Sequence, residues 1–320
     1  MRDGYGREID YMRVSVTDRC DLRCRYCMPE GIEKVPMSRI LTYEEIERIC
    51  RVSASLGIRK IKITGGEPLV RLGCVDLIRN LKATEGIEQV TMTTNGQILD
   101  RYIDGLKEAG IDGINISLDS LKPERYEYIT GRGKLENTLR SIDLSAASGI
   151  KTKVNCLPQH GFNDDELTEI ASLAWDKGID VRFIELMPIG IGDPAKGMSN
   201  DDVLAALREE WPELEPDKSV HGNGPAVYYR RPEIPGAIGL ISAMHGPFCS
   251  SCNRIRLTSM GQIKPCLCYE DETDIRPYLD RSDDELREAI RKAILNKPKA
   301  HCFDGRKSGI EPRLMAQIGG

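Results

Sequence analysis

The chain has 320 residues, 40% hydrophobic and 30% charged, enough for one large domain or for a domain with a smaller extension. Its formal net charge of −5 and its aromatic content of 5% do not favour nonspecific or single-strand nucleic-acid binding. No stretch approaches the roughly 20 apolar residues of a membrane-spanning helix, and the charged start lacks the apolar region of a signal peptide. We therefore expect a cytoplasmic protein that binds neither nucleic acid nor a membrane.

Three cysteines follow directly on a strand-like run near the start of the chain. After residues 11–17, Cys20, Cys24 and Cys27 form the pattern C-x3-C-x2-C, with no fourth Cys or His nearby. Structural zinc and electron-transfer [4Fe–4S] clusters usually take four ligands, so three thiolates would leave one iron open to a small molecule. In a reducing cytosol we expect the eleven cysteines to be metal ligands or buried thiols rather than disulfides.

A weak internal repeat organises residues 12–190. Five helical stretches end in Gly followed by Ile, and a strand-like run comes after each. Glycine just past a helix can take the left-handed conformation while the next apolar residue packs on the last turn. The first helix also has a capping-box pattern over residues 42–45. The five pairs are Gly57-Ile58, Gly86-Ile87, Gly110-Ile111, Gly149-Ile150 and Gly178-Ile179. This unit implies parallel strands with right-handed crossovers.

Five of the six strand-like runs alternate apolar and polar residues, and the sixth, over residues 181–187, does so less cleanly. In residues 60–64, for example, two isoleucines alternate with two lysines and a threonine. Parallel strands covered by helices on both faces are usually apolar throughout, so the alternation favours a barrel whose polar face lines a lumen. Because six strands are countable rather than eight, we expect an incomplete, TIM-like (β/α)6 barrel. A sheet with one solvated face is the alternative.

The loop over residues 65–68 is Gly-Gly-Glu-Pro and follows the second strand. Paired glycines let a backbone approach a ligand closely, although an ordinary turn uses the same residues. Both this loop and the cysteine loop come after strands, where barrel enzymes gather their sites. We therefore expect the two loops at the same end of the barrel.

A second group of cysteines lies in the last quarter of the chain. Cys249 and Cys252 are followed by Cys266, and the residues between them predict a β-hairpin with its turn near 259–261. The hairpin would bring Cys252 and Cys266 close enough to share a cluster. Cys268 falls on the same hairpin face as Cys266. A three-cysteine iron–sulfur cluster and a four-cysteine zinc or electron-transfer site therefore both fit the spacing.

Basic residues gather on the predicted polar face. Arg254 and Arg256 project together from the hairpin, and paired guanidinium groups suit phosphate or carboxylate recognition, although a solvated hairpin face is the alternative. The other basic residues of the predicted lumen are Arg13, Lys60, Lys62, Lys153 and Arg182. In a chain of net negative charge, this set predicts a highly anionic small ligand such as a nucleoside triphosphate.

The last residues of the chain, 306–320, predict a flexible tail. A frayed terminus is the default expectation for such a segment. The terminal Gly319-Gly320 is its one distinctive feature.

These motifs together resemble a known family. The first cysteine pattern, with Tyr26 between its last two cysteines, and the Gly-Gly-Glu-Pro loop are similar to the radical S-adenosylmethionine (SAM) superfamily. The second cysteine group, the Arg254 segment, the sequence RFIELM at 182–187 and the terminal glycines narrow the resemblance to the GTP 3′,8-cyclases of molybdenum cofactor biosynthesis. The resemblance covers nearly the whole chain.

The resemblance implies a radical reaction on GTP. SAM would bind the open iron of a first [4Fe–4S] cluster, and one electron from an external flavodoxin- or ferredoxin-type reductant would cleave it. The 5′-deoxyadenosyl radical would remove the 3′ hydrogen of the GTP ribose, and attack on C8 of guanine would give 3′,8-cyclo-7,8-dihydro-GTP. A second [4Fe–4S] cluster would face the guanine. A cyclic pyranopterin monophosphate synthase would use the product.

The resemblance also implies roles for individual residues. The cluster ligands would be Cys20, Cys24 and Cys27 for the first cluster and Cys249, Cys252 and Cys266 for the second. The SAM contacts would be Tyr26, Gly66, Ser117 and Met187. The GTP contacts would be Arg13, Lys62, Thr93, Lys153, Arg254 and Arg256, helped by Lys60 and Arg182. Arg254 and Arg256 would also serve catalysis with Gly319 and Gly320, whose terminal carboxylate would assist in the active site.

Two positions depart from the family pattern. Lys62 stands where some relatives have Arg, which keeps the charge but loses the bidentate geometry. Cys268 is extra and leaves the ligand set of the second cluster open. The cysteines that match no motif are expected to be packing residues; they are Cys50, Cys74, Cys156 and Cys302.

The expected organisation is a radical SAM partial barrel over residues 1–220 and a domain for the auxiliary cluster and the substrate over 221–320. We expect a monomer or a homodimer. The alternative enzyme is a peptide-modifying radical SAM enzyme with an auxiliary cluster. The non-enzymatic alternative is a metal-stabilised scaffold or electron carrier.

Overall fold

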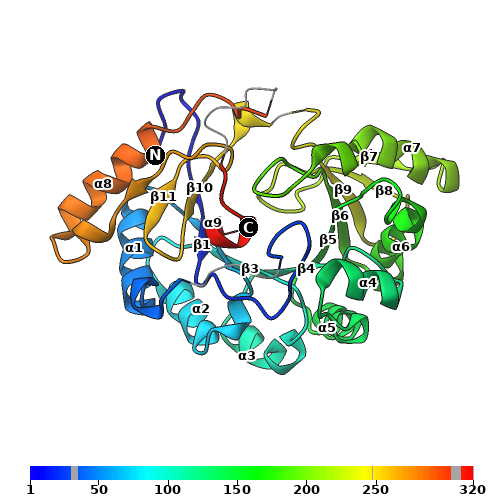
Figure 1. Cartoon of the computed structure of the whole chain (residues 1–320), viewed down its shortest axis with the longest axis horizontal. Coiled ribbons are helices and arrows are strands. Elements are labelled where there is room, and N and C mark those ends of the chain that lie inside the picture. The colour runs from blue at the N-terminus through cyan, green and yellow to red at the C-terminus, as the bar shows by residue number, and fades with distance from the viewer. Residues whose placement is uncertain (30–34, 247, 304–310, 320) are drawn as a thin grey trace.

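One curved sheet forms the framework of the protein in the computed structural model, which describes residues 1–29, 35–246, 248–303 and 311–319 (Figure 1). Strands and helices alternate through its first part. The strands are β1 (Tyr11–Ser15), β2 (Lys60–Thr64), β3 (Gln89–Thr94), β4 (Gly113–Ser117), β5 (Thr152–Cys156) and β6 (Asp180–Ile184). The helices are α1 (Tyr43–Ser55), α2 (Cys74–Ala83), α3 (Ile103–Glu108), α4 (Pro123–Thr130), α5 (Leu135–Ala147) and α6 (Leu167–Lys177).

The remaining elements extend the same sheet. The later strands are β7 (Glu215–Asp217), β8 (Val227–Arg230), β9 (Ala237–Ile241), β10 (Arg254–Leu257), β11 (Gln262–Lys264) and β12 (Thr273–Asp274). The later helices are α7 (Asn200–Glu210), α8 (Asp283–Leu295) and α9 (Met315–Ile318). The strand order is β12-β11-β10-β1-β2-β3-β4-β5-β6-β9-β8-β7.

The incomplete barrel predicted from the sequence is confirmed. All six predicted strands are present and pair in parallel with their neighbours. In addition, β10 pairs in parallel with β1, and β9 pairs in parallel with β6, so the last part of the chain widens the barrel wall at both edges. Strand β7 lies before residue 220 and β8 lies after it, and the two strands pair with each other. The division into two domains at residue 220 therefore stays a prediction.

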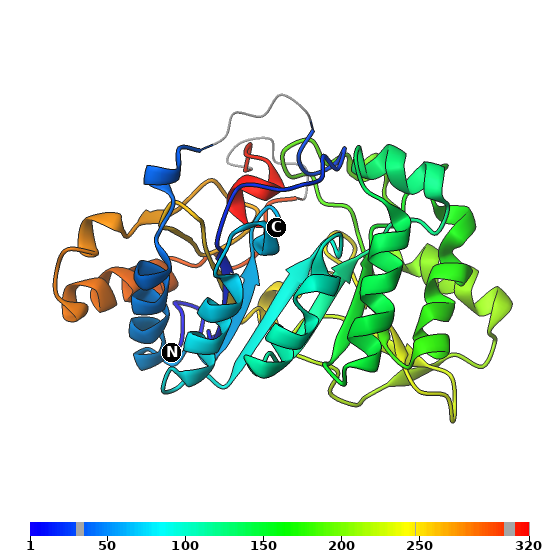
Figure 2. The same ribbon diagram turned by 90° about the horizontal axis from the view of Figure 1, so that it is seen from below.

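The helices α1 to α6 lie on the convex side of the sheet, and the concave side encloses the C-terminal helix α9 (Figures 1 and 2). The apolar half of each alternating strand packs under the helices. These side chains are at most 1% exposed and include Met12, Val14, Ile61, Ile63, Val90, Met92, Ile114, Ile116, Val154 and Phe183. Each contributes about 1.5–3 kcal/mol through burial. The polar half is thereby left facing the concave side.

The helix ends follow the local signals in the sequence. The glycines of all five Gly-Ile pairs have positive φ, and they are Gly57 (96°), Gly86 (85°), Gly110 (76°), Gly149 (82°) and Gly178 (62°). The isoleucine after each is buried. At the start of α1, the Thr42 hydroxyl accepts from the Glu45 amide at 3.2 Å and the Glu45 carboxylate accepts from the Thr42 amide at 2.7 Å. The capping box is therefore confirmed.

The predicted hairpin is also confirmed. Strands β10 and β11 pair antiparallel, and the Thr258 amide donates to the Gln262 carbonyl at 2.9 Å across the turn. Gly261 in the turn has a φ of 86°. Over the described part of the chain, none of the helices combines the length and the apolar character required to cross a membrane.

Candidate active site

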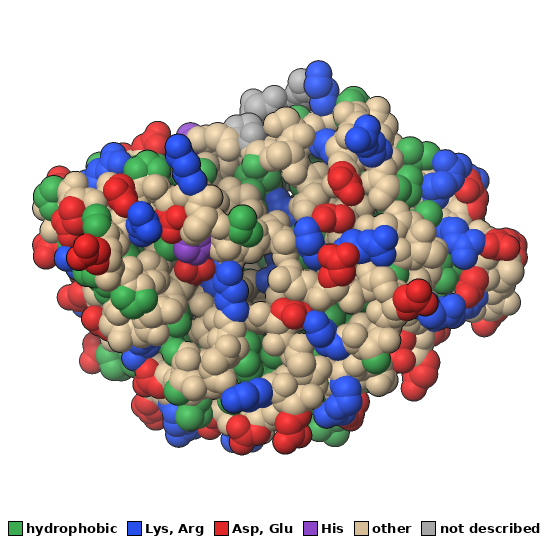
Figure 3. Space-filling model, turned by 180° about the vertical axis from the view of Figure 1, so that it is seen from behind, with side chains coloured by type: hydrophobic (Ala, Val, Ile, Leu, Met, Phe, Trp, Pro, Cys, Tyr) green, Lys and Arg blue, Asp and Glu red, His purple; other side chains and the backbone are tan. Residues whose placement is uncertain are grey.

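A cavity of about 440 Å³ lies within the concave side of the barrel. It is lined by most of the residues that the sequence singled out. They are Arg13, Cys20, Cys24, Tyr26, Cys27, Lys62, Gly66, Thr93, Ser117, Lys153, Arg182, Met187, Cys249, Cys252, Arg254, Arg256 and Cys266. Figure 3 shows Lys and Arg side chains around a central hollow on the face opposite to that of Figure 1. We refer to this cavity as the chamber.

The first cysteine trio lies at the carboxyl end of β1. Its loop is tied to α4, because the amides of Arg23 and Arg25 donate to carbonyls at the end of that helix at 2.8 and 3.0 Å. Within the loop, the Cys27 amide donates to the Cys24 carbonyl at 3.0 Å. The Tyr26 hydroxyl donates to the buried Asp119 carboxylate at 2.7 Å. These contacts hold the three thiols at the rim of the chamber.

The Gly-Gly-Glu-Pro loop supports the cysteine loop. The amides of Gly66 and Glu67 donate to the carbonyls of Thr17 and Arg19 at 2.7 and 2.8 Å. A Cβ on Gly66 would lie 2.3 Å from the Arg19 carbonyl oxygen, so only glycine fits. The predicted close backbone approach is therefore made to the chain's own cysteine loop, while Gly66 also lines the chamber.

The second cysteine trio lies at the opposite end of the chamber. Cys249 and Cys252 precede β10, and Cys266 follows β11, the antiparallel neighbour of β10. Because β10 is parallel to β1, this trio sits at the amino ends of the parallel strands, whereas the first trio follows a carboxyl end. Both trios line one cavity.

The thiols of the first trio have acidic surroundings. Burial raises the pKa of Cys20 to about 12 and that of Cys27 to about 11. The Glu67 carboxylate raises the pKa of Cys20 further, and the Asp119 carboxylate raises the pKa of Cys27 further. Burial also raises the pKa of Glu67 to about 7. A bound cation favours the thiolate form of a coordinating cysteine, so these surroundings suit a positively charged guest.

Within the second trio, Cys252 has basic surroundings, whereas burial raises the pKa of Cys249. Burial by itself would raise the pKa of Cys252, but Arg254 and Lys297 outweigh it and lower the value to about 7. The ammonium of Lys297 is buried and donates to the carbonyls of Arg254 and Pro265 at 2.8 and 2.6 Å. This end of the chamber therefore favours negative charge.

Cys268 is joined to Cys302 by a disulfide. The expectation that the cysteines would not form bridges is wrong for this pair, and Cys302 is more than a packing residue. The reason is tertiary, because the two Cα atoms lie 6.2 Å apart although 34 residues separate them in sequence. Since Cys249, Cys252 and Cys266 are free, the pairing favours a three-cysteine set over a four-cysteine set.

A row of cations crosses the chamber wall, in which Lys62 is buried and Arg13 and Arg256 are half-buried. Arg13 of β1 is in register between Arg256 of β10 and Lys62 of β2. Burial lowers the pKa of Lys62 well below its usual value, and repulsion from Arg182 and Arg13 lowers it further. Cations held together out of water are costly unless an anion joins them. The row therefore favours an anionic ligand in the chamber.

Lys153 is held by protein partners. Its ammonium donates to the His221 carbonyl at 2.6 Å and to the Tyr228 hydroxyl at 2.9 Å, and it forms an ion pair with Asp180. Burial lowers its pKa to about 8, even though Asp180 opposes that shift. An ammonium has three donors, so a phosphate that binds Lys153 has to replace one of these partners.

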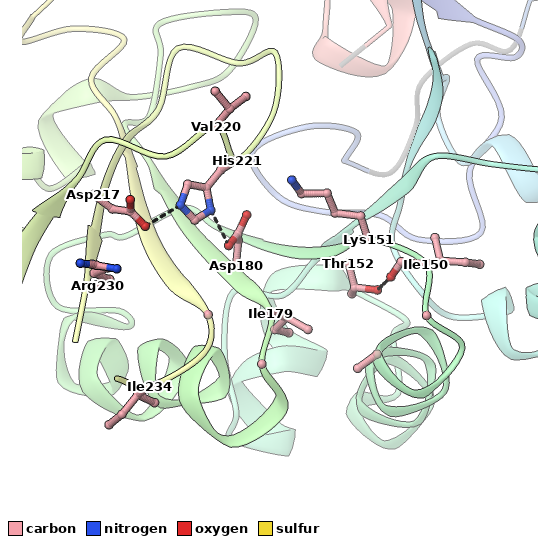
Figure 4. A pocket seen from close by; sticks show the side chains of 14 residues that line it. Ile150, Lys151, Thr152, Ile179, Asp180, Asp217, Val220, His221, Arg230 and Ile234 are labelled. Carbon is pink, nitrogen blue, oxygen red and sulfur yellow. Dashed lines mark hydrogen bonds and ion pairs between the residues drawn. The ribbon is translucent and has the colours of Figure 1, made fainter. Parts of the chain in front are cut away.

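The same network closes the amino end of the chamber. The His221 ring lies between Asp180 and Asp217, with nitrogen–oxygen distances of 2.9 and 2.8 Å (Figure 4). It also stacks on Tyr228, with ring centroids 4.0 Å apart. Beyond it lies a second cavity, of about 530 Å³, at the amino ends of β5 and β6. His221 lines both cavities and so contributes to the wall between them.

Lys60 differs from the other predicted basic residues. Its ammonium forms an ion pair with Asp10 at 2.7 Å, and it is not among the residues described as lining the chamber. Alternation placed it correctly on the polar side of β2, but its position at the first residue of the strand brings it to Asp10 instead.

The tail is ordered over residues 311–319, so a frayed terminus is the wrong expectation there. Ala316 and Ile318 of α9 are buried, and the Gly319 carbonyl accepts from Arg256 Nη1 at 2.6 Å. Gly319 has a φ of 78°, and an added Cβ would lie 2.8 Å from the Ser15 Cβ. Gly320 lies outside the described residues.

Several site residues were missed in the sequence. Asp119 had a signal, because alternation put it on the polar face of its strand, yet it matched no motif. Lys297 had none. His301, whose amide donates to the Cys249 sulfur at 3.4 Å and which lines the chamber, also had none. Lys297 and His301 reach the site from segments far along the chain, so their roles depend on tertiary contacts.

Comparison with known proteins agrees with this architecture. Residues 14–174 match the family model described as Radical SAM superfamily, and residues 179–303 match that described as Molybdenum Cofactor Synthesis C. The chain is 43% identical over 323 residues to a GTP 3′,8-cyclase of Clostridium perfringens (strain SM101 / Type A), with 100% of both chains covered. It is 46% identical over 324 residues to a GTP 3′,8-cyclase of Peptoclostridium acidaminophilum, with 99% of this chain and 98% of that one covered.

Solved structures share the fold at low identity. Streptococcus suis SuiB bound to S-adenosylmethionine superposes with a TM-score of 0.66 at 16% identity, covering 92% of this chain and 73% of that one. The tagged protein anSMEcpe with bound AdoMet gives a TM-score of 0.60 at 15% identity, covering 92% of this chain and 79% of that one. At these identities the likeness concerns the fold alone.

Proposed function

The chain belongs to the radical SAM superfamily and, within it, to the GTP 3′,8-cyclase family, and on that premise we propose that it converts GTP to (8S)-3′,8-cyclo-7,8-dihydroguanosine 5′-triphosphate. This would be the first step of molybdenum cofactor biosynthesis. The observation that carries the proposal is one chamber that is lined by both cysteine trios and by a row of arginine and lysine side chains.

Membership of the superfamily implies a [4Fe–4S] cluster and SAM at the first trio. The residues fit, because three free thiols from one short loop line the chamber. Among the described residues, no three His, Cys, Asp or Glu side chains surround a point that a single ion could occupy. The cluster assignment therefore rests on the spacing and the shared cavity. With SAM bound, this site would supply a carbon radical that removes a hydrogen atom.

The chain's own residues would position SAM at that end. Tyr26 is oriented by Asp119, which also accepts from the Leu157 amide at 2.9 Å. The remaining proposed SAM contacts that line the chamber are Gly66, Ser117 and Met187. Because the carboxylates at this end are buried, they favour the positively charged sulfonium of SAM.

The other end would position GTP. We propose that Arg13, Lys62, Thr93 and Lys153 contact GTP, that Arg182 and Lys60 help with the triphosphate, and that Arg254 and Arg256 serve both binding and catalysis. The Arg254 guanidinium lies 4.7 Å from the centre of the Phe248 ring, which limits its freedom. Cys249, Cys252 and Cys266 would hold a second [4Fe–4S] cluster facing the base. Gly319 and Gly320 would complete the site.

The wider setting is also proposed. An external one-electron reductant of flavodoxin or ferredoxin type would serve the first cluster, and a cyclic pyranopterin monophosphate synthase would take the product. We propose a cytoplasmic location and a monomer or homodimer.

The test is an anaerobic assay of the reconstituted protein with SAM, a chemical reductant and GTP. We expect 5′-deoxyadenosine and a cyclised nucleotide to form with GTP and neither to rise with ATP. A peptide-modifying enzyme would show no affinity for GTP. Absence of GTP-dependent 5′-deoxyadenosine would contradict the proposal.

A further inference from the structure

A buried ion pair joins the tail to the barrel wall. Lys264 of β11 and Glu311 at the start of the described tail form it, and both side chains are 0% exposed. The Lys264 ammonium also donates to the Tyr269 carbonyl at 2.7 Å. Glu311 accepts from Arg313 Nε at 2.8 Å, and its amide donates to the Cys268 carbonyl at 2.8 Å. Glu311 is thus held by main-chain and side-chain contacts at once.

The register of the hairpin connects this pair to the chamber. Lys264 lies directly opposite Arg256 in the β10–β11 ladder, and directly opposed antiparallel residues have Cα atoms about 4.5–5.5 Å apart. Arg256 holds Gly319 at 2.6 Å. Both ends of the segment 311–319 are therefore held by neighbouring basic residues. Eight extended residues could span about 26 Å, so holding both ends from two neighbouring residues requires the segment to fold back.

The charges of these residues also connect the ion pair to the chamber. Lys264, Arg256 and Arg13 follow one another across three neighbouring strands. Without a partner, Lys264 would add a fully buried cation beside two half-buried ones that already repel each other. Glu311 supplies the compensating charge. Buried ion pairs often give no net stability over an apolar pair of similar size. The stability of the fold therefore does not require an ion pair at this position.

From these observations we propose that Lys264 and Glu311 are positioning residues for the reaction. They set the point at which the tail enters the chamber, and they thereby hold Gly319 against Arg256. This inference rests on the proposed function, and it adds two residues outside the chamber lining to those that the reaction needs.

The first arm of the test measures hydrogen exchange of the tail in the reconstituted protein. In Glu311→Gln, we expect amides of residues 312–319 to exchange at least about 10-fold faster, because the buried charge of Lys264 loses its partner. The matched control is Glu272→Gln, which removes only the partly exposed contact to Arg313 at 2.6 Å; there we expect little change. Unchanged tail protection in Glu311→Gln, or loss of protection throughout the chain, would overturn the proposal.

The second arm is a double-mutant cycle with a chain that lacks residues 312–320. In the full chain, Glu311→Gln should lower GTP-dependent 5′-deoxyadenosine and cyclised product at least about 10-fold. In the shortened chain, which lacks Gly319 and Gly320, the readout is the residual 5′-deoxyadenosine, and the substitution should have no further effect on it. Equal losses in both backgrounds would mean a structural role and would overturn the proposal. The exchange arm needs no turnover. A failure of the proposed function would therefore appear separately, as absence of product from the unaltered chain.

Discussion

The two cysteine trios share a count and a chamber, but acidic residues lie around the first trio, whereas basic residues lie around Cys252 of the second. Burial together with Glu67 and Asp119 raises the thiol pKa values at the first trio, whereas Arg254 and Lys297 lower that of Cys252 at the second. An acid-lined end favours a cationic guest, and SAM carries a sulfonium. A base-lined end favours an anionic one, and GTP carries a triphosphate. We infer that charge, rather than cysteine spacing, separates the two tasks proposed for the trios.

The largest expected effects come from breaking each trio in turn. Cys24→Ser should abolish SAM cleavage, whereas Cys266→Ser should leave some SAM cleavage but give no cyclised product. Each should reduce the iron content from about eight to about four atoms per chain. Iron analysis measures the loss of each cluster, and assays of 5′-deoxyadenosine and cyclised nucleotide measure the two activities. Loss of iron in Cys50→Ser, a buried cysteine outside both trios, would contradict the assignment, and identical phenotypes for the two trios would contradict the division of tasks.

The next largest effect concerns the basic end. Arg256→Ala should weaken GTP binding by about 10²-fold, because truncating one member of a buried charged contact typically costs about 2–5 kcal/mol. Calorimetry with GTP measures it. Arg79→Ala, on the exposed face of α2, serves as the control. SAM binding should change little, and a matching loss of SAM affinity would argue against separate ends.

A smaller effect is expected at the acidic end. Asp119→Asn should slow SAM cleavage by about 10-fold, since supporting residues around a metal site typically contribute 10- to 100-fold. Removing a carboxylate should also make the first cluster easier to reduce, which an electron paramagnetic resonance titration measures. Asp104→Asn on the exposed side of α3 is the control. A fall in the reduction potential would refute the electrostatic reading.

The smallest effect is a pH dependence at Lys153. Because burial lowers its pKa to about 8, the ammonium loses its proton above pH 8, and GTP affinity should fall by up to about tenfold per pH unit. Lys153→Arg should remove this dependence. The folded pKa lies below the usual 10.5, so the free energy of unfolding should rise between about pH 8 and 10.5. A GTP affinity independent of pH in the unaltered chain would count against this role.

Local rules predicted most of the fold. Each Gly-Ile pair specifies a helix end through one residue's φ and its neighbour's burial, and strand alternation assigns each side chain a face. Both depend on residues close in sequence. Lys60 shows the limit, because alternation gave its face correctly but not its ion pair with Asp10. The register of β2 against its neighbouring strand determines that ion pair, and register depends on contacts between strands that are distant in sequence.

The cysteine spacings, the polar strand faces and the family motifs were therefore readable in the chain alone, since each is a pattern over neighbouring positions. Three features were not readable in this way. They are the position of the two trios at opposite ends of the chamber, the Cys268–Cys302 disulfide, and the contacts of Lys264 and Arg256 with the tail. These depend on how β10 and β11 join the edge of the barrel beside β1. That packing brings residues more than two hundred positions apart into contact, and no short-range pattern encodes it.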